Sequence, residues 1–269
     1  MYWREVWRFI NSNENEYKYR GKYGAKGEKR AKRKKATPEQ IKKQNQLNKE
    51  KKLRRLIKAN FFPLDLWCTL KYPKGARPPI EQVMKDIRNF LDRMRYRRKK
   101  KGELFKFIYR VEIGKRGGVH IHILVNRSDK KPDTDIEIKE AWKPGSVYWT
   151  TIYEHGGYSD LAAYIVKEPE DDGQMSLFPE KERKKLRSYT PSRNLIKPEP
   201  ERTMHSKRTV RKLIEEGPKP TPGYYIVKES IECGVNPYTG MSYLRYTENR
   251  IHEIHSGMPE KETTIWSSG

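Results

Sequence analysis

The stretch Val119-His120-Ile121-His122-Ile123-Leu124-Val125 places two histidines inside a short apolar run. β-Branched residues surround them and Gly117-Gly118 precedes them, a pattern that is typical of a β-strand. Because side chains alternate between the two faces of a strand, His120 and His122 share one face and stand about 7 Å apart. Both imidazoles are therefore close enough to bind one metal ion.

A second strand is predicted directly upstream, over Phe105 to Glu112, and the glycine-rich connection 114–118 is typical of a hairpin turn. If the hairpin is centred near Arg116, Glu112 lies opposite His120 on the same face, with Cβ atoms about 4.5–5.5 Å apart. Two histidines and one carboxylate would then converge and leave coordination positions open, a donor set that favours Mg²⁺ or Mn²⁺. A slip of one residue would turn Glu112 to the other face.

The segment from Glu112-Ile113-Gly114 to Gly118-Val119-His120-Ile121-His122 resembles the metal motif of the HUH endonucleases. This superfamily includes rolling-circle replication initiators and relaxases, and the likeness is closest to the replication proteins of phages and plasmids. Two further segments resemble the family. Cys68-Thr69-Leu70-Lys71-Tyr72 is a variant of its Thr-Leu-Thr-type core strand, and Tyr164-Ile165-Val166-Lys167 resembles its Y-x-x-K nucleophile motif, here on a predicted helix.

The resemblance implies an activity. Tyr164 would be the nucleophile and Lys167 its catalytic partner, with His120, His122 and Glu112 as the metal ligands. The expected reaction is nicking of single-stranded DNA through a covalent 5′-phosphotyrosine, which leaves a free 3′-OH to prime synthesis and is later reversed to rejoin strands. The expected partners are single-stranded and duplex origin DNA, and a host helicase or other replication machinery.

The composition indicates a polyanionic partner. The net charge is +24, the isoelectric point is near 9.8 and the mean hydropathy is −1.05. Between Lys18 and Lys58 the chain holds 18 Lys or Arg against three Glu, and a helix is predicted there from Pro38, capped by Thr37 and Gln40. We interpret this segment as an arm that binds the DNA backbone, although a merely solvated basic tail is the alternative. The residues predicted to bind DNA are Lys32, Arg33, Lys34, Lys35, Arg54 and Arg55 in the arm, and Arg97 and Arg98 at the end of a later helix.

The predicted elements alternate between strands and helices, which favours an α+β fold. We expect an antiparallel sheet with helices on one face, a ferredoxin-like or RRM-like nuclease core. The predicted division is a basic N-terminal arm (1–60), an HUH endonuclease domain (61–168), a charged linker (169–190) and a C-terminal accessory region (191–269). The two cysteines form no metal-binding pair, and neither a signal peptide nor a membrane span is visible, so we expect a cytoplasmic protein.

Other functions remain open on the sequence alone. A relaxase or a transposase of the same superfamily would share these motifs. A basic nucleic-acid-binding protein without catalysis would use the same arm and sheet, but it gives no reason for Glu112, His120 and His122 to converge. A metal-dependent hydrolase that uses water would need the metal ligands but not Tyr164.

Overall fold

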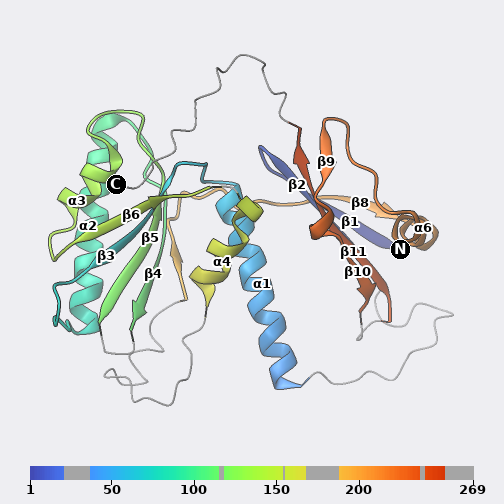
Figure 1. Ribbon diagram of the computed structural model, residues 1–269, viewed down its shortest axis with the longest axis horizontal. Helices are drawn as coiled ribbons and strands as arrows, with labels where there is room; N and C mark the ends of the chain where they lie inside the picture. Colours follow the sequence, from blue (N-terminus) through green and yellow to red (C-terminus); the bar gives the residue numbers. More distant parts are fainter. Residues whose placement is uncertain (21–36, 115–117, 154, 168–187, 237–239, 252–269) are drawn as a thin grey trace, which may run out of the picture. The chain divides into compact units, whose positions relative to one another are not determined.

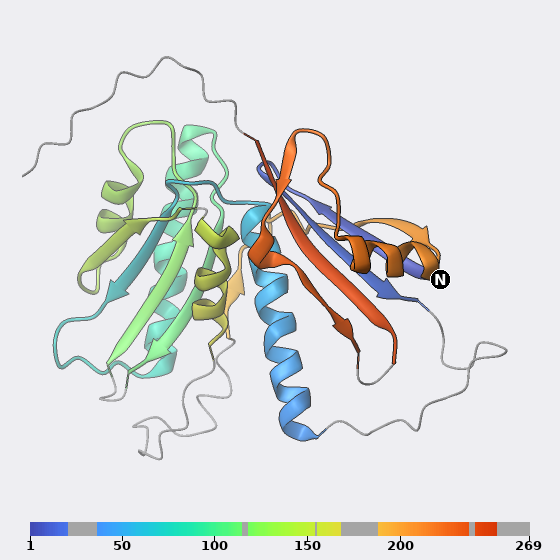
Figure 2. The ribbon, with the colours of Figure 1, turned by 45° about the vertical axis from the view of Figure 1, so that its right-hand side comes forward.

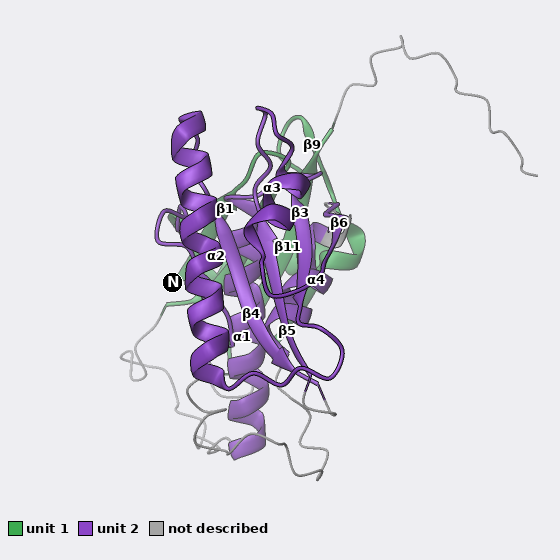
Figure 3. Ribbon diagram, turned by 90° about the vertical axis from the view of Figure 1, so that its left-hand side faces the viewer, with its two compact units in different colours: residues 1–35, 199–269 green, residues 36–198 purple. Residues whose placement is uncertain are grey.

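The computed structural model describes residues 1–20, 37–114, 118–153, 155–167, 188–236 and 240–251. The chain divides into two compact units, residues 1–35 with 199–269 and residues 36–198, which Figure 3 shows in different colours. The predicted nuclease domain (61–168) lies inside the second unit. The other predicted boundaries differ from this division, because residues 1–20 and the helix from Pro38 belong to folded units and not to a separate arm. The predicted linker falls mostly on 168–187, outside the described residues.

The unit of residues 36–198 is built on one antiparallel sheet. Its strand order is β6-β3-β5-β4-β7, and β4 and β5 form the predicted hairpin. The bounds are β3 (Leu66–Lys71), β4 (Phe107–Ile113), β5 (Val119–Val125), β6 (Val147–Thr151) and β7 (Thr190–Pro191). The α+β class and the antiparallel pairing are confirmed.

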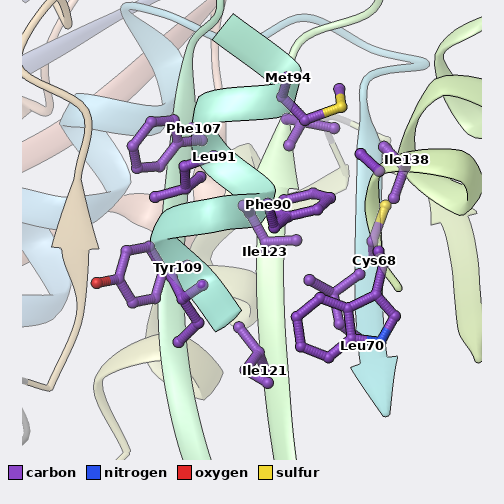
Figure 4. Close-up of a cluster of buried hydrophobic side chains, with 14 of the residues drawn as sticks. Cys68, Leu70, Phe90, Leu91, Met94, Phe107, Tyr109, Ile121, Ile123 and Ile138 are labelled. Atoms are coloured by element: carbon purple, nitrogen blue, oxygen red, sulfur yellow. The ribbon is translucent and has the colours of Figure 1, made fainter. Parts of the chain in front are cut away.

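One face of this sheet is a dry core. Helix α2 (Ile80–Lys101) lies on it, and α3 (Thr134–Ala141) packs beside α2 (Figure 1). The predicted apolar stripe of α2 is wholly buried and consists of Val83, Ile87, Phe90, Leu91 and Met94. It meets every second side chain of the strands, and Figure 4 shows Cys68, Leu70, Phe107, Tyr109, Ile121 and Ile123 among them. Alternation along the strands thus supplies one continuous apolar surface.

The other face of the sheet also carries helices, which corrects the prediction of helices on one face only. Helix α1 (Pro38–Lys58) and helix α4 (Ser159–Val166) pack together against it, and a short 3₁₀ helix η1 (His155–Tyr158) leads into α4 (Figures 1 and 2). The buried contacts include Leu53 and Ile57 of α1 with Ile108 and Leu124 of the sheet. The sequence suggested a solvated arm because α1 is so basic, but its last turns hold an apolar stripe that needs burial. The predicted capping box of Thr37 and Gln40 is present.

The other unit joins the two ends of the chain in a second antiparallel sheet of order β10-β11-β2-β1-β8, with β9 paired to β11. Tyr2, Tyr17, Leu244 and Tyr246 of the sheet form its small core with Val210 of α6. The bounds are β1 (Tyr2–Arg8), β2 (Ser12–Tyr19), β8 (Glu201–His205), α6 (Lys207–Glu216), β9 (Tyr224–Ile226), η2 (Lys228–Ser230), β10 (Glu232–Val235) and β11 (Ser242–Arg250). Within the described residues, every helix is too short or too polar to cross a membrane.

Candidate active site

The hairpin of β4 and β5 has the register that the sequence predicted. Glu112 pairs with His120, and the rings of His120 and His122 lie 6.4 Å apart between centroids. On the next strand, β3, Thr69 pairs with His122 and Lys71 with His120. Directly opposed residues project from the same face of a sheet, so these five side chains share the face that α4 approaches.

Tyr164 of α4 meets this row of side chains. Its hydroxyl donates a hydrogen bond of 3.0 Å to Glu112 Oε2 and lies 3.1 Å from His122 Nε2. Glu112 Oε2 is also 3.0 Å from His122 Nε2. The phenol, the carboxylate and one imidazole therefore meet within hydrogen-bonding distance, and Tyr164 is still 40% exposed, which leaves it open to a substrate.

His122 is held more tightly than His120. It is only 8% exposed, its ring stacks on Trp67 with centroids 5.6 Å apart, and its Nδ1 is hydrogen-bonded to Thr69 Oγ1 at 3.1 Å. Burial lowers the pKa of His122, against the opposing effect of the Glu112 charge. The imidazole is thus neutral at pH 7, the form that binds a metal, and the bond at Nδ1 orients Nε2 toward Glu112 and Tyr164.

The surroundings of Tyr164 keep its proton in place. Burial raises the pKa of the phenol, and the hydrogen bond to Glu112 and the charge of that carboxylate raise it further. The guanidinium of Arg110 acts in the opposite direction, with Cζ 5.7 Å from the centre of the Tyr164 ring. A phenol in this state is a weak nucleophile until additional positive charge arrives.

Arg110 also anchors α4, a role that the sequence analysis missed. Its guanidinium donates to the backbone carbonyls of Tyr164 and Ile165, the latter at 3.2 Å, and Gln46 of α1 donates to the carbonyl of Val166 at 3.1 Å. The last carbonyls of a helix lack partners within the helix, so these bonds hold the end of α4 in place. The available signal was the position of Arg110, two residues before Glu112 and therefore on the same face of β4.

The donor set suits a divalent metal ion. Two imidazoles and one carboxylate share one face, and the separation of 3.0 Å between His122 Nε2 and Glu112 Oε2 is about that of two neighbouring ligands around one octahedral ion. In the described residues, however, no group of three His, Cys, Asp or Glu side chains is drawn together as a finished metal site. Glu112 and His122 bond instead to each other and to Tyr164, so an ion would have to replace those hydrogen bonds.

Lys167 does not lie on the helix beside Tyr164 as expected. Helix α4 ends at Val166, and Lys167 is the exposed residue that follows, with its backbone N–H 3.3 Å from the Tyr164 carbonyl. The helix also begins differently, because Ser159 is its first residue and Tyr158, not Ser159, precedes it in a left-handed conformation. Tyr158 is buried in the core beneath α4, as predicted for a packing residue.

The basic residues predicted to bind DNA have different environments. Arg98 is fully buried and bridges Glu103 and Glu137 at 3.0 and 3.2 Å, so its assignment to DNA binding is wrong. It was misassigned because a basic run on a helix end hides which member points inward. Arg97 pairs with Glu140 at 2.6 Å.

The other predicted DNA contacts belong to the basic segment. On α1, Arg55 is buried and Arg54 is half-buried. Lys32, Arg33, Lys34 and Lys35 lie outside the described residues.

Comparison with known proteins adds one finding. No curated protein and no solved structure matches the chain. Residues 65–169, less than half of the chain, match the model of a family of replication-associated proteins of the ORF2 type. This segment carries Glu112, His120, His122 and Tyr164, and the match supports a replication-associated protein of the initiator type.

Proposed function

We propose that this protein is a metal-dependent endonuclease that nicks and rejoins single-stranded DNA at a specific site and so initiates rolling-circle replication. The observation that carries the proposal is the position of the Tyr164 hydroxyl, within 3.1 Å of both Glu112 and His122 on the sheet face that also holds His120. A tyrosine that merely packs would not need three ionisable side chains around its oxygen. The match of residues 65–169 to a replication-associated family supports the biological role.

In the proposed reaction, Tyr164 Oη attacks the phosphorus of one phosphodiester. The Oη–P bond forms, the bond from phosphorus to the 3′ oxygen breaks, and the 3′ oxygen leaves and takes up a proton. The proton of Tyr164 passes to Glu112 Oε2, which already accepts its hydrogen bond. The product is a DNA 5′-phosphate on Tyr164 and a free 3′-OH, and reversal of the same step rejoins a strand without ATP.

The metal ligands in this proposal are Glu112, His120 and His122. A bound divalent ion supplies positive charge that stabilises both the phenolate and the phosphate oxygens. Thr69 orients His122 through Nδ1, and Arg110 holds the backbone of Tyr164. Arg110 thus supplies the fixed cation beside the phenol that was expected from Lys167.

The role in replication follows from the products. A free 3′-OH on duplex DNA primes a polymerase, while the covalent bond to Tyr164 retains the other end for joining when synthesis has passed once around the circle. Origin DNA is therefore the proposed partner. A relaxase or transposase would use the same chemistry, and the replication-associated family match favours the initiator.

The test is capture of the covalent adduct. The full-length protein is incubated with Mg²⁺ or Mn²⁺ and a pool of single-stranded oligonucleotides that carry a random central segment, and protein–DNA adducts are isolated after denaturation. We expect adducts joined to the 5′ end of the downstream fragment, mapped by mass spectrometry to Tyr164, and sequencing of the bound DNA gives the nicking site. A chelator and Tyr164→Phe should each abolish the adduct.

The matched control is Tyr153→Phe, which removes the same oxygen from an exposed tyrosine outside the cluster. It should leave the adduct unchanged. Metal-dependent cleavage without any adduct would overturn the proposal in favour of a hydrolase that uses water. An adduct on another tyrosine would overturn the assignment of Tyr164.

A further inference from the structure

The edge strand β6 extends the candidate active site with an open surface. Tyr148 pairs with Thr69, which pairs with His122, so the three side chains form one row across three strands. Tyr148 is 59% exposed, and the residues two positions before and after it on the same face, Ser146 and Thr150, are exposed as well. An aromatic ring therefore faces solvent on the same side of the sheet as the cluster around Tyr164.

A lysine lies against this ring. Lys71 Nζ is 4.3 Å from the centre of the Tyr148 ring, and Lys71 pairs with His120 on the neighbouring strand. Its ammonium group thus belongs both to the row of metal-ligand candidates and to the exposed ring. Cβ atoms of opposed residues lie about 4.5–5.5 Å apart, so a lysine side chain reaches a phosphate beside His120 with ease.

The backbone beneath the pair is fixed. The Lys71 N–H donates to the Ser146 carbonyl at 2.9 Å, and the indole N–H of Trp142 donates to the Lys71 carbonyl at 3.1 Å. Gly145 allows this approach, because a Cβ at that position would stand 2.2 Å from the Lys71 oxygen. Both side chains therefore project from a rigid base, which is how a binding position keeps its geometry.

We propose that Lys71 and Tyr148 bind one nucleotide of single-stranded DNA next to the scissile phosphate, with the base stacked on Tyr148 and its phosphate held by Lys71. This inference rests on the proposed function and adds a substrate position to it. An exposed ring offers a stacking face to any base, and a neighbouring ammonium binds the backbone, the combination used for single strands. A base in a duplex is already stacked on both faces, so the position selects unpaired DNA.

A second Tyr–Lys pair provides a matched control. Tyr96 on α2 is 60% exposed and has Lys100 Nζ 4.7 Å from its ring centre, but α2 covers the opposite face of the sheet. The chemistry is the same and only the location differs. If any exposed tyrosine beside a lysine binds DNA, both pairs will behave alike.

Affinity is measured by fluorescence anisotropy with the full-length protein, a chelator, and two labelled single-stranded 12-mers, oligothymidine and its abasic analogue. Tyr148→Ala should weaken binding of oligothymidine about tenfold and leave the abasic strand unchanged, because only stacking is removed. Lys71→Gln should weaken both probes and lower the slope of log K against log salt by about 0.7, the value for one single-strand phosphate contact. Tyr96→Ala and Lys100→Gln should change neither.

Location is tested by photo-crosslinking with the same 12-mer carrying 5-iododeoxyuridine. We expect a crosslink to Tyr148, identified by peptide mapping, and none to Tyr96. An unchanged affinity of Tyr148→Ala for oligothymidine, an equal loss on the abasic strand, or crosslinks confined to other residues would each overturn the inference. Since Tyr148 is exposed, its replacement leaves the core intact, and an unchanged melting temperature verifies this.

The outcomes separate this inference from the proposed function. Binding is measured with the metal removed, so no cleavage contributes to it. If the position binds DNA but the wild-type protein forms no adduct with a metal present, the proposed chemistry fails and the binding position stands. If the adduct forms while Tyr148→Ala binds normally, the binding position fails and the chemistry stands.

Discussion

The two faces of the strands β3 and β5 differ sharply, although the same short segments build both. One face presents Cys68, Leu70, Ile121 and Ile123 to α2, and these side chains are almost wholly buried (Figure 4). The opposite face presents Thr69, Lys71, His120 and His122, which are hydrogen-bonded, charged or open to solvent. The period of two residues keeps the two sets apart without any additional segment.

The difference teaches how a small sheet combines stability with reactivity. Burial on the α2 face supplies the free energy that holds the strands in register, and that register aligns Glu112 with His120. The other face can then carry polar groups at little cost, because α1 and α4 cover it only around Ile108 and Leu124. A substitution should therefore affect either stability or chemistry, according to its face.

The largest effect is expected from His122→Ala, on the reactive face. Loss of a metal ligand and of a partner of Tyr164 should reduce adduct formation by about 1000-fold, because metal stabilisation of the transition state contributes on the order of 4 kcal/mol. Affinity for single-stranded DNA should stay within about twofold, since phosphate contacts dominate binding. Single-turnover rates and anisotropy measure the two. A rate near that of the wild type would remove His122 from the site.

On the buried face, Ile123→Ala should cost about 3 kcal/mol in the free energy of unfolding, or roughly 100-fold in the folding equilibrium. Denaturant titration measures this loss. The rate of adduct formation per folded molecule should not change, because Ile123 points away from Tyr164 into the core. If that rate falls together with stability, the two faces are not independent.

A smaller effect is expected from Thr69→Val, which keeps the shape of the side chain and removes the hydroxyl bonded to His122 Nδ1. Partners behind metal ligands typically contribute about 10- to 100-fold, so we expect a loss of about tenfold in metal affinity, measured by titrating Mn²⁺ into the adduct assay. The matched variant on the other face is Cys68→Ser. It should lower stability and leave the Mn²⁺ dependence as it was.

The smallest effect per residue is expected outside both faces. Replacing Lys32, Arg33, Lys34 and Lys35 together by Gln should weaken binding to duplex DNA without changing the nicked sequence. The slope of log K against log salt should fall by about 0.9 for each phosphate that is no longer neutralised. An unchanged slope would show that these residues do not contact the duplex, whereas an altered nicking site would give them a role in recognition.

Much of the site could be predicted before the fold was known. The alternation around His120 and His122 placed both on one face, and a short hairpin brought Glu112 opposite His120 because few residues separate the two strands. Tyr164 could be found only through its resemblance to a motif, since the spacing of one tyrosine and one lysine carries little information by itself. The helix stripe of α2 and the capping box of α1 were predictable because both depend on residues within a few positions of each other.

Contacts between distant segments needed the tertiary structure. The sequence of α1 looks like a solvated basic helix, yet Leu53 and Ile57 are buried because α4 and the sheet happen to meet them. Arg98 and Arg110 are arginines in basic or alternating segments, and only the fold shows that one is buried among acids while the other holds α4. The pairing of β2 with β11 joins opposite ends of the chain. Local periodicity thus determined which faces exist, and packing between distant segments decided what each face touches, because burial depends on neighbours that no local pattern encodes.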